Sequence, residues 1–180
     1  DEVINITIPS TVKSIGLDSF SNCSKLQYVV YKGNNNPFDG NSFVNIGSFI
    51  AYVSMDYKDN KFCGLNASKV YFCGETCFGQ YIETTNTLEI TGSGNMFDFN
   101  DGNTPWKEKN SLIQTITVNG ISSIGINAFK DCIYLESISI GSSISLINGN
   151  NPFVGCSKLT TIKFESNEYF KYEMGMIMKK

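Results

Sequence analysis

The side chains that most often carry out chemistry in proteins are represented here by six cysteines, and the sequence contains no histidine. Without histidine, Ser-His and Cys-His nucleophiles cannot form, and the commonest general base and metal ligand are missing. The acidic residues are scattered among predicted turns, and the apolar periodicity places no pair of them on one face. A Ser-Lys or paired-carboxylate mechanism is still compatible with the composition, but the sequence favours a protein that is not an enzyme, without catalytic residues or a cofactor.

Three of the cysteines, Cys63, Cys73 and Cys77, lie in a short stretch near the middle of the chain. In an oxidising compartment we expect one disulfide there, joining Cys63 to Cys73 or to Cys77 and leaving one thiol over. The alternative is a zinc site made of the three thiolates, since Cys73 and Cys77 are four residues apart, but a fourth ligand is not visible. The sequence therefore favours a disulfide and predicts no metal site.

Two further motifs resemble ligand-binding loops only in part. Gly92-Ser93-Gly94 is not followed by the Gly-Lys-Ser/Thr of a phosphate loop. Residues 98–102 resemble the start of a calcium loop, but the glycine is at position five, and Lys109 stands where the loop needs glutamate. Both motifs are interpreted as polar turns.

The other three cysteines belong to a pattern that is repeated along the chain. Phe-x-x-Cys-x-x-Leu occurs three times, and the copies at Cys132 and Cys156 are 24 residues apart. A period of 20 to 29 residues with apolar-x-x-apolar-x-apolar is the signature of leucine-rich repeats, in which each unit adds one short strand to a parallel sheet. We expect the three cysteines to be buried and unpaired. The predicted structural ladder comprises Phe20, Cys23, Leu26, Phe129, Cys132, Leu135, Phe153, Cys156 and Leu159.

Each repeat is predicted to contribute a strand whose alternate residues face opposite sides of the sheet. Ile116 and Val118 should point into the core while Thr115 and Thr117 point outward, and the other copies show the same alternation. Outward side chains on neighbouring strands would stand about 4.8 Å apart. Such a surface would bind by shape and hydrogen bonds and not by charge. The predicted binding face comprises Asn5, Thr7, Tyr28, Val30, Thr115, Thr117, Ser137, Ser139, Thr161 and Lys163.

The phenylalanines of the repeat are its bulkiest inward residues. Phe20, Phe129 and Phe153 are predicted to stack as an aromatic spine on the convex side of the coil, and Phe38 and Phe43 are candidates for the same position.

Between the clearest repeats the pattern is less regular. Residues 80–90 predict a hairpin that turns at Thr85-Asn86. Trp106 is the only tryptophan, and we interpret it as a plug between two blocks of repeats and not as a ligand contact.

These units resemble BspA-like leucine-rich-repeat proteins, which are surface antigens of bacteria and protozoan parasites. The resemblance rests on runs such as Ile8-Pro9-Ser10-x-Val12-x-x-Ile15-Gly16 before the Phe-x-x-Cys-x-x-Leu element, and it is strongest at residues 3–31 and 113–164. It implies a mostly β leucine-rich-repeat solenoid, a right-handed coil with a parallel sheet on one face and turns or short helices on its convex side. One copy departs from the pattern, with Leu146-Ile147-Asn148-Gly149 where the others have Ile-Gly.

We expect three segments along the chain. Residues 1–66 would form a first repeat block with a closing cap, residues 67–112 a junction of hairpin and turns, and residues 113–180 a second block that is truncated at its end. Together they would form one continuous structural domain. The chain opens inside a repeat without a signal sequence, so we expect a parent protein that continues on both sides.

The charge of the chain limits its partners. With 14 basic and 17 acidic residues the net charge is −3, which predicts neither a nucleic-acid surface nor a basic membrane patch. No apolar run approaches the roughly 18 residues of a membrane helix, so no direct membrane insertion is expected.

The family resemblance implies a cell-surface or extracellular location. It also implies adhesion to a host protein, a matrix component or a cell-surface glycan through the strand face. The alternatives are a structural spacer or antigenic coat without a defined ligand, and an intracellular leucine-rich-repeat scaffold. The oligomeric state is left open by the sequence.

Overall fold

The structure, a computed structural model, describes residues 3–37, 42–43, 46–149, 151–173 and 176–180. Its internal contacts divide the chain into two compact units, Asp1–Val70 and Tyr71–Lys180. Each unit has its own cluster of buried apolar side chains. The three segments predicted from the sequence, and their union in one continuous domain, stay predictions.

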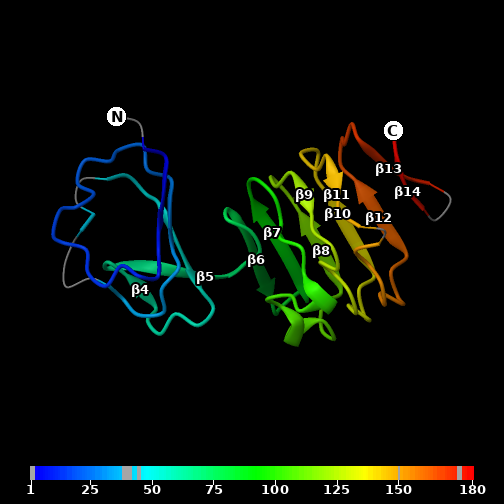
Figure 1. Cartoon of the computed structure of the whole chain (residues 1–180), viewed down its shortest axis with the longest axis horizontal. Coiled ribbons are helices and arrows are strands. Elements are labelled where there is room, and N and C mark those ends of the chain that lie inside the picture. The colour runs from blue at the N-terminus through cyan, green and yellow to red at the C-terminus, as the bar shows by residue number, and fades with distance from the viewer. Residues whose placement is uncertain (1–2, 38–41, 44–45, 150, 174–175) are drawn as a thin grey trace. The chain divides into compact units, whose positions relative to one another are not determined.

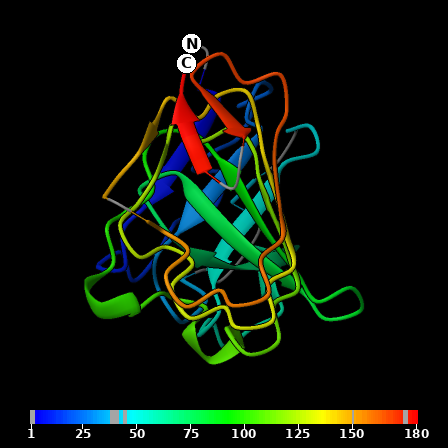
Figure 2. The same cartoon turned by 90° about the vertical axis from the view of Figure 1, so that its right-hand side faces the viewer.

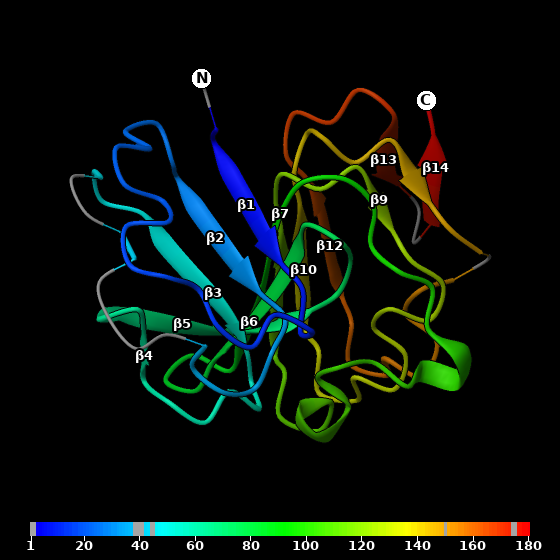
Figure 3. The ribbon, with the colours of Figure 1, turned by 60° about the vertical axis from the view of Figure 1, so that its left-hand side comes forward.

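The first unit is built on parallel strands (Figure 3). In order across the sheet these are β1 (Asn5–Ile8), β2 (Tyr28–Tyr31), β3 (Ile50–Ser54) and the first part of β5 (Leu65–Phe72). The short β4 (Lys61–Phe62) pairs with the start of β5 in the antiparallel sense. Each parallel pair is joined by a long excursion of the chain, as expected for one strand per repeat.

The second unit repeats this plan with more strands. A hairpin of β6 (Cys77–Ile82) and β7 (Thr87–Gly92) is followed by the parallel strands β8 (Thr115–Val118), β10 (Ser137–Ile140) and β12 (Thr161–Phe164). Figure 1 shows these strands side by side, and in Figure 2 successive coils of this unit overlie one another. The hairpin turns at 83–86, which confirms the turn predicted at Thr85-Asn86.

Smaller elements complete the second unit. The described part of the chain contains two 3₁₀ helices, η1 (Asn100–Gly102) and η2 (Lys107–Lys109). A second short parallel sheet joins β9 (Ser123–Ile124) to β11 (Leu146–Ile147), and an antiparallel hairpin of β13 (Phe170–Glu173) and β14 (Met176–Lys179) follows β12. The predicted fold class, a mostly β leucine-rich-repeat solenoid with a parallel sheet, is confirmed.

The two-residue alternation of the strands is clearest in β8 and β10. Ile116, Val118 and Ile140 are completely buried, whereas Thr115 and Thr117 between them are half-buried. Apolar side chains on one face of four neighbouring strands therefore form the core of the second unit, and the opposite face keeps its hydroxyls accessible.

Aromatic rings stack along the coils of both units, as the spine prediction requires. Phe129 stacks on Phe153 with ring centroids 5.7 Å apart and an interplanar angle of 12°. In the first unit Phe20 stacks on Phe43 at 4.8 Å. Phe38 lies outside the described residues.

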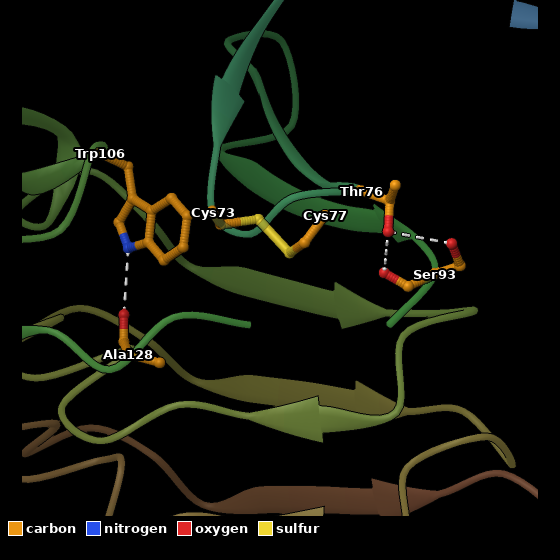
Figure 4. Close-up of a disulfide and its surroundings, with 6 residues drawn as sticks. All are labelled: Cys73, Thr76, Cys77, Ser93, Trp106 and Ala128. Atoms are coloured by element: carbon orange, nitrogen blue, oxygen red, sulfur yellow. Dashed lines mark hydrogen bonds between the residues drawn. A yellow bond between two sulfur atoms is a disulfide. The ribbon is translucent and has the colours of Figure 1, made fainter. Parts of the chain in front are cut away.

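Trp106 extends this spine within the second unit. Its ring stacks on Phe129 at 6.1 Å, the side chain is completely buried, and its Nε1 donates a hydrogen bond to the Ala128 carbonyl at 3.2 Å (Figure 4). The indole thus covers the end of the phenylalanine stack, and its one polar atom has a partner, as a buried tryptophan requires.

The turn before each ladder cysteine needs a left-handed backbone. Asn22, Asp131 and Gly155 occupy this position with φ of 63°, 61° and 82°. Asparagine, aspartate and glycine are the residues that adopt this conformation at least cost, so the residue types follow from the backbone geometry.

The predicted disulfide of Cys63 is wrong. Cys73 is bonded to Cys77, with Cα atoms 5.1 Å apart (Figure 4). Cys63 is a free, buried thiol in the core of the first unit. The reason is local: β5 and β6 are antiparallel neighbours, and the Cys73 amide donates to the Cys77 carbonyl at 3.0 Å. The hairpin therefore brings together two cysteines that are only four residues apart.

The same finding removes the zinc alternative for this stretch, since two of its three thiolates are spent in the disulfide. Next to the bond, Thr76 Oγ1 donates to the Ser93 carbonyl at 2.8 Å, and the Ser93 hydroxyl lies 3.1 Å from Thr76 Oγ1. These bonds tie the cysteine turn to the end of β7 (Figure 4).

Candidate functional site

The candidate site is the outward surface of the four parallel strands in the second unit, which we call the strand face. Strand register places its side chains in two rows that run across β7, β8, β10 and β12. The strand face comprises Thr87, Glu89, Thr115, Thr117, Ser137, Ser139, Thr161 and Lys163.

The first row consists entirely of hydroxyl side chains. Thr87, Thr115, Ser137 and Thr161 are consecutive register partners, so their positions repeat at the spacing of neighbouring strands, about 4.8 Å. Thr115 Oγ1 and Ser137 Oγ lie 3.4 Å apart. Because each hydroxyl can donate once and accept twice, a pair joined by one bond keeps capacity for a ligand.

The second row carries charge only at its ends. Glu89 stands on β7, Thr117 and Ser139 occupy the middle, and Lys163 stands on β12. A ligand that lies across the strands would therefore meet a carboxylate at one end, hydroxyls in the middle and an ammonium group paired with the Glu165 carboxylate at the other end.

Glu165, just after β12, organises the positive end of this row. Its Oε1 accepts hydrogen bonds from Lys163 Nζ at 2.8 Å and from Ser139 Oγ at 3.0 Å. These two bonds lower the pKa of the Glu165 carboxyl, and the bond from Lys163 has the larger effect. The group is solvent-exposed, so the ion pair orients side chains and contributes little to stability.

In the first unit the equivalent face is less open. Asn5 and Thr7 on β1 are exposed and Tyr28 on β2 is half-buried, but Val30 is completely buried. The prediction that Val30 belongs to an exposed binding face is therefore wrong. Val30 pairs with Tyr52 on β3 and follows Tyr28 on the same face, so a short side chain stands between two large ones, whose rings are 5.9 Å apart.

The ladder residues lie on the inner side of the coils. Leu26, Phe129, Cys132, Leu135 and Phe153 are buried. The remaining four, Phe20, Cys23, Cys156 and Leu159, are half-buried and pack against the two core clusters. These side chains serve packing and take no part in the strand face.

Four residues beside or on these faces were missed by sequence reasoning: Thr87, Glu89, Glu165 and Tyr52. The sequence does contain a signal for Thr87 and Glu89. They alternate with the apolar residues Leu88 and Ile90, as outward residues do in the other strands. The sequence predicts residues 80–90 only as a hairpin, and the register alone shows that β7 also pairs in parallel with β8.

Two other features are absent from the part of the chain that the structure describes. Within those residues, no group of three histidine, cysteine, aspartate or glutamate side chains could hold a metal ion. No helix among them is long and apolar enough to cross a membrane.

The repeats seen in the structure match a known family. Residues 2–66 and 105–174 match the family described as BspA type leucine-rich-repeat region, in six copies. A leucine-rich-repeat protein from Eubacterium ventriosum, solved by crystallography, is 27% identical, with a TM-score of 0.47 over 55% of this chain. The chain spans about a quarter of that protein, 26% of its length. A comparison with curated proteins gave no significant match.

The family match covers most of the chain, and it falls on the same repeats whose strands form the parallel sheets. Leucine-rich repeats of this kind are protein-interaction modules. The chain therefore belongs to the BspA type leucine-rich-repeat family.

Proposed function

We propose that this chain is a non-enzymatic recognition module at the cell surface or outside the cell, which binds a host protein, a matrix component or a cell-surface glycan through the strand face. The observation that carries the proposal is the unbroken row of hydroxyls Thr87, Thr115, Ser137 and Thr161 on four neighbouring strands. Packing of the core does not require hydroxyl side chains on the outer face. A surface that contacts only water does not require the same type of side chain on every strand.

The size of these side chains supports close contact with a ligand. Serine and threonine lose little conformational freedom when they are buried, and a ligand can approach the sheet without displacing long side chains. Each hydrogen bond in an interface contributes only about 0.5–1.5 kcal/mol, so affinity must come from many of them together. The strand face offers eight side chains in a regular array for that purpose.

The disulfide supports the proposed location. Cys73 and Cys77 are bonded in the structure, and stable disulfides belong mainly to secreted and surface proteins. A cytosolic scaffold would be expected to keep this pair reduced.

The proposal is tested by placing charge in the middle of the strand face. The double substitution Thr117→Glu, Ser139→Glu should abolish binding to an immobilised basement-membrane extract or to the glycans that the wild type retains on an array of linear and branched glycans. A matched control, Ser111→Glu with Ser143→Glu, makes the same charge change at exposed turn residues outside the strand face.

Circular dichroism would show that both variants are folded. Equal loss of binding in both would point to non-specific repulsion, and unchanged binding in the strand-face variant would exclude this surface. A wild-type chain that binds none of these probes would favour the spacer or antigenic coat.

A further inference from the structure

Two free cysteines in the second unit occupy the same place on neighbouring coils. Cys132 and Cys156 are 24 residues apart, which is also the register step from β10 to β12. The coils are hydrogen-bonded to each other beside them: the Phe129 amide donates to the Pro152 carbonyl at 3.0 Å, and the Asp131 amide donates to the Val154 carbonyl at 2.7 Å.

The two thiols stand at equivalent positions on these neighbouring coils, and each changes the pKa of the other. In addition, Cys156 Sγ lies 3.0 Å from the Phe129 carbonyl, to which it can donate. Neighbouring backbones in such a ladder stand about 4.8 Å apart, within the range of about 4.4–6.8 Å between Cα atoms that a disulfide needs. The pair is thus close to bonding geometry although both thiols are free.

Access to the pair is from one side. Cys132 is completely buried, and the neighbouring Cys156 thiol together with this burial raises the pKa of its thiol. Cys156 is half-buried and lines an open cavity of about 560 Å³. The other walls of this cavity include Phe153, Leu159 and Ile177. A small reagent can therefore reach Cys156 first and Cys132 only through it.

We propose that Cys132 and Cys156 form an oxidation site for small organic disulfides, which converts the pair into a disulfide between two coils. The Cys156 thiol gives its proton to water, and the thiolate attacks one sulfur of the reagent. The reagent's S–S bond breaks, one reagent thiol leaves with a proton from water, and Cys156 carries a mixed disulfide.

Cys132 then attacks Cys156 Sγ, the mixed disulfide breaks, and the second reagent thiol leaves with the proton that Cys132 gives up. Two protein thiols are oxidised, one reagent disulfide is reduced to two thiols, and no other oxidant is needed. The product joins the coil that carries β12 covalently to the one that carries β10. It would restrain Thr161 and Lys163, whatever ligand the strand face takes.

Cys23 provides a matched control within the chain. It stands at the same repeat position and is also half-buried. The bond from the Phe20 amide to the Ser42 carbonyl corresponds to that from Phe129 to Pro152, so the neighbour of Cys23 on the next coil is Ile46 and not a cysteine. Cys23 can accept a mixed disulfide, but it has no cysteine at the equivalent position of the next coil.

The test is to incubate the folded 180-residue chain with oxidised glutathione, block free thiols in denaturant, and digest without reduction. Mass spectrometry should find a peptide pair linked through Cys132 and Cys156, with little glutathione on Cys156. In Cys132→Ser the glutathione adduct on Cys156 should persist. An adduct on Cys23 should persist in both the wild type and Cys132→Ser. The melting temperature should rise by roughly 5 °C or more on oxidation of the wild type and not of Cys132→Ser.

Two results would overturn the proposal. One is a wild-type chain in which Cys156 keeps its glutathione and no linked pair is found, which would mean that Cys132 cannot reach it. The other is a linked pair that appears only when oxidation is carried out in denaturant. Both results are measured on the wild-type chain. They therefore decide the question even if Cys132→Ser does not fold.

Discussion

The two units are built from the same repeat but differ in how their sheets treat the outer face. In the second unit the outward residues of β8 and β10 are small and hydroxylated, so each strand alternates between buried and half-buried residues. In the first unit β2 has three consecutive buried residues, Val29, Val30 and Tyr31. Large outward tyrosines close the face around Val30, whereas small hydroxyls leave a face open.

The cores of the two units also differ in how many large aromatic side chains they contain. The core of the first unit is aromatic around Tyr31, whose ring lies edge-on to Tyr57 at 6.0 Å and against Phe62 at 5.4 Å. Burial raises the pKa of the Tyr57 hydroxyl, which donates to the Lys61 carbonyl at 2.9 Å. The buried core of the second unit consists mainly of branched aliphatic residues, with the stack of Trp106, Phe129 and Phe153 among them. In the second unit, an aliphatic core thus occurs together with a regular outer surface.

The largest expected effect on stability comes from removing one phenylalanine ring of the spine from each unit. Phe129→Ala should lower the free energy of unfolding by about 3–5 kcal/mol, because a completely buried ring leaves a cavity between Trp106 and Phe153. Phe20→Ala should cost less, since Phe20 is half-buried. Urea unfolding followed by the single tryptophan reports the second unit, and amide hydrogen exchange reports the first. Equal costs would contradict the difference in burial.

The disulfide is the next largest difference between the units. Replacing Cys73 and Cys77 by serine should destabilise the second unit by about 2 kcal/mol, the value expected for a very short closed loop. Hydrogen exchange should rise around β6 and β7 and stay unchanged around β1 and β2. As a control, a thiol reductant acting on the wild type should give the same local rise without any change of side chain, because the other four cysteines are already free. A uniform rise across both units would show that the disulfide acts on the whole chain.

The turn before the ladder cysteine allows a smaller, paired test. Gly155→Ala should cost about 1–2 kcal/mol, because alanine is strained at a φ of 82° and its Cβ would meet the side chain of Asp131. Asn22→Gly, at the same repeat position in the first unit, should be close to neutral, since glycine adopts the left-handed conformation freely. Thermal unfolding compares the two. A neutral Gly155→Ala would mean that the turn can change its conformation.

The smallest expected effect concerns the charged end of the strand face. Lys163 and Ser139 lower the pKa of Glu165 in the folded chain. Their contribution to the free energy of unfolding is therefore fully present above the pKa that Glu165 has in the unfolded chain, and it is lost as the pH falls through the pKa that Glu165 has in the folded chain. Lys163→Gln should therefore raise the pKa of Glu165 towards its ordinary value, as measured by NMR titration of its side-chain carboxyl. Ser111→Gln is a control outside the strand face. An unchanged pKa would mean that the ion pair does not form in solution.

Much of the fold could be predicted because the repeat is a local signal. The two-residue alternation in residues 115–118 and 137–140 predicted strands and their inner faces, and the spacing of Phe129 and Phe153 predicted their stacking. The candidate site was predicted in part, since most strand-face residues lie in the clearest repeats. Thr87 and Glu89 were missed because their strand also forms a hairpin, and a hairpin pattern alone does not show what pairs with its other edge.

The repeat pattern was sufficient for strand positions, for inner and outer faces, and for the family, because side-chain direction along a strand depends only on neighbouring residues. Only the tertiary structure decided that Val30 is buried, that Cys73 bonds to Cys77, and that Cys132 meets Cys156. Each of these outcomes depends on which distant or antiparallel segment lies against the residue. Periodicity in a single sequence specifies whether a side chain points into the core or outward. Tertiary packing determines which residue it then contacts.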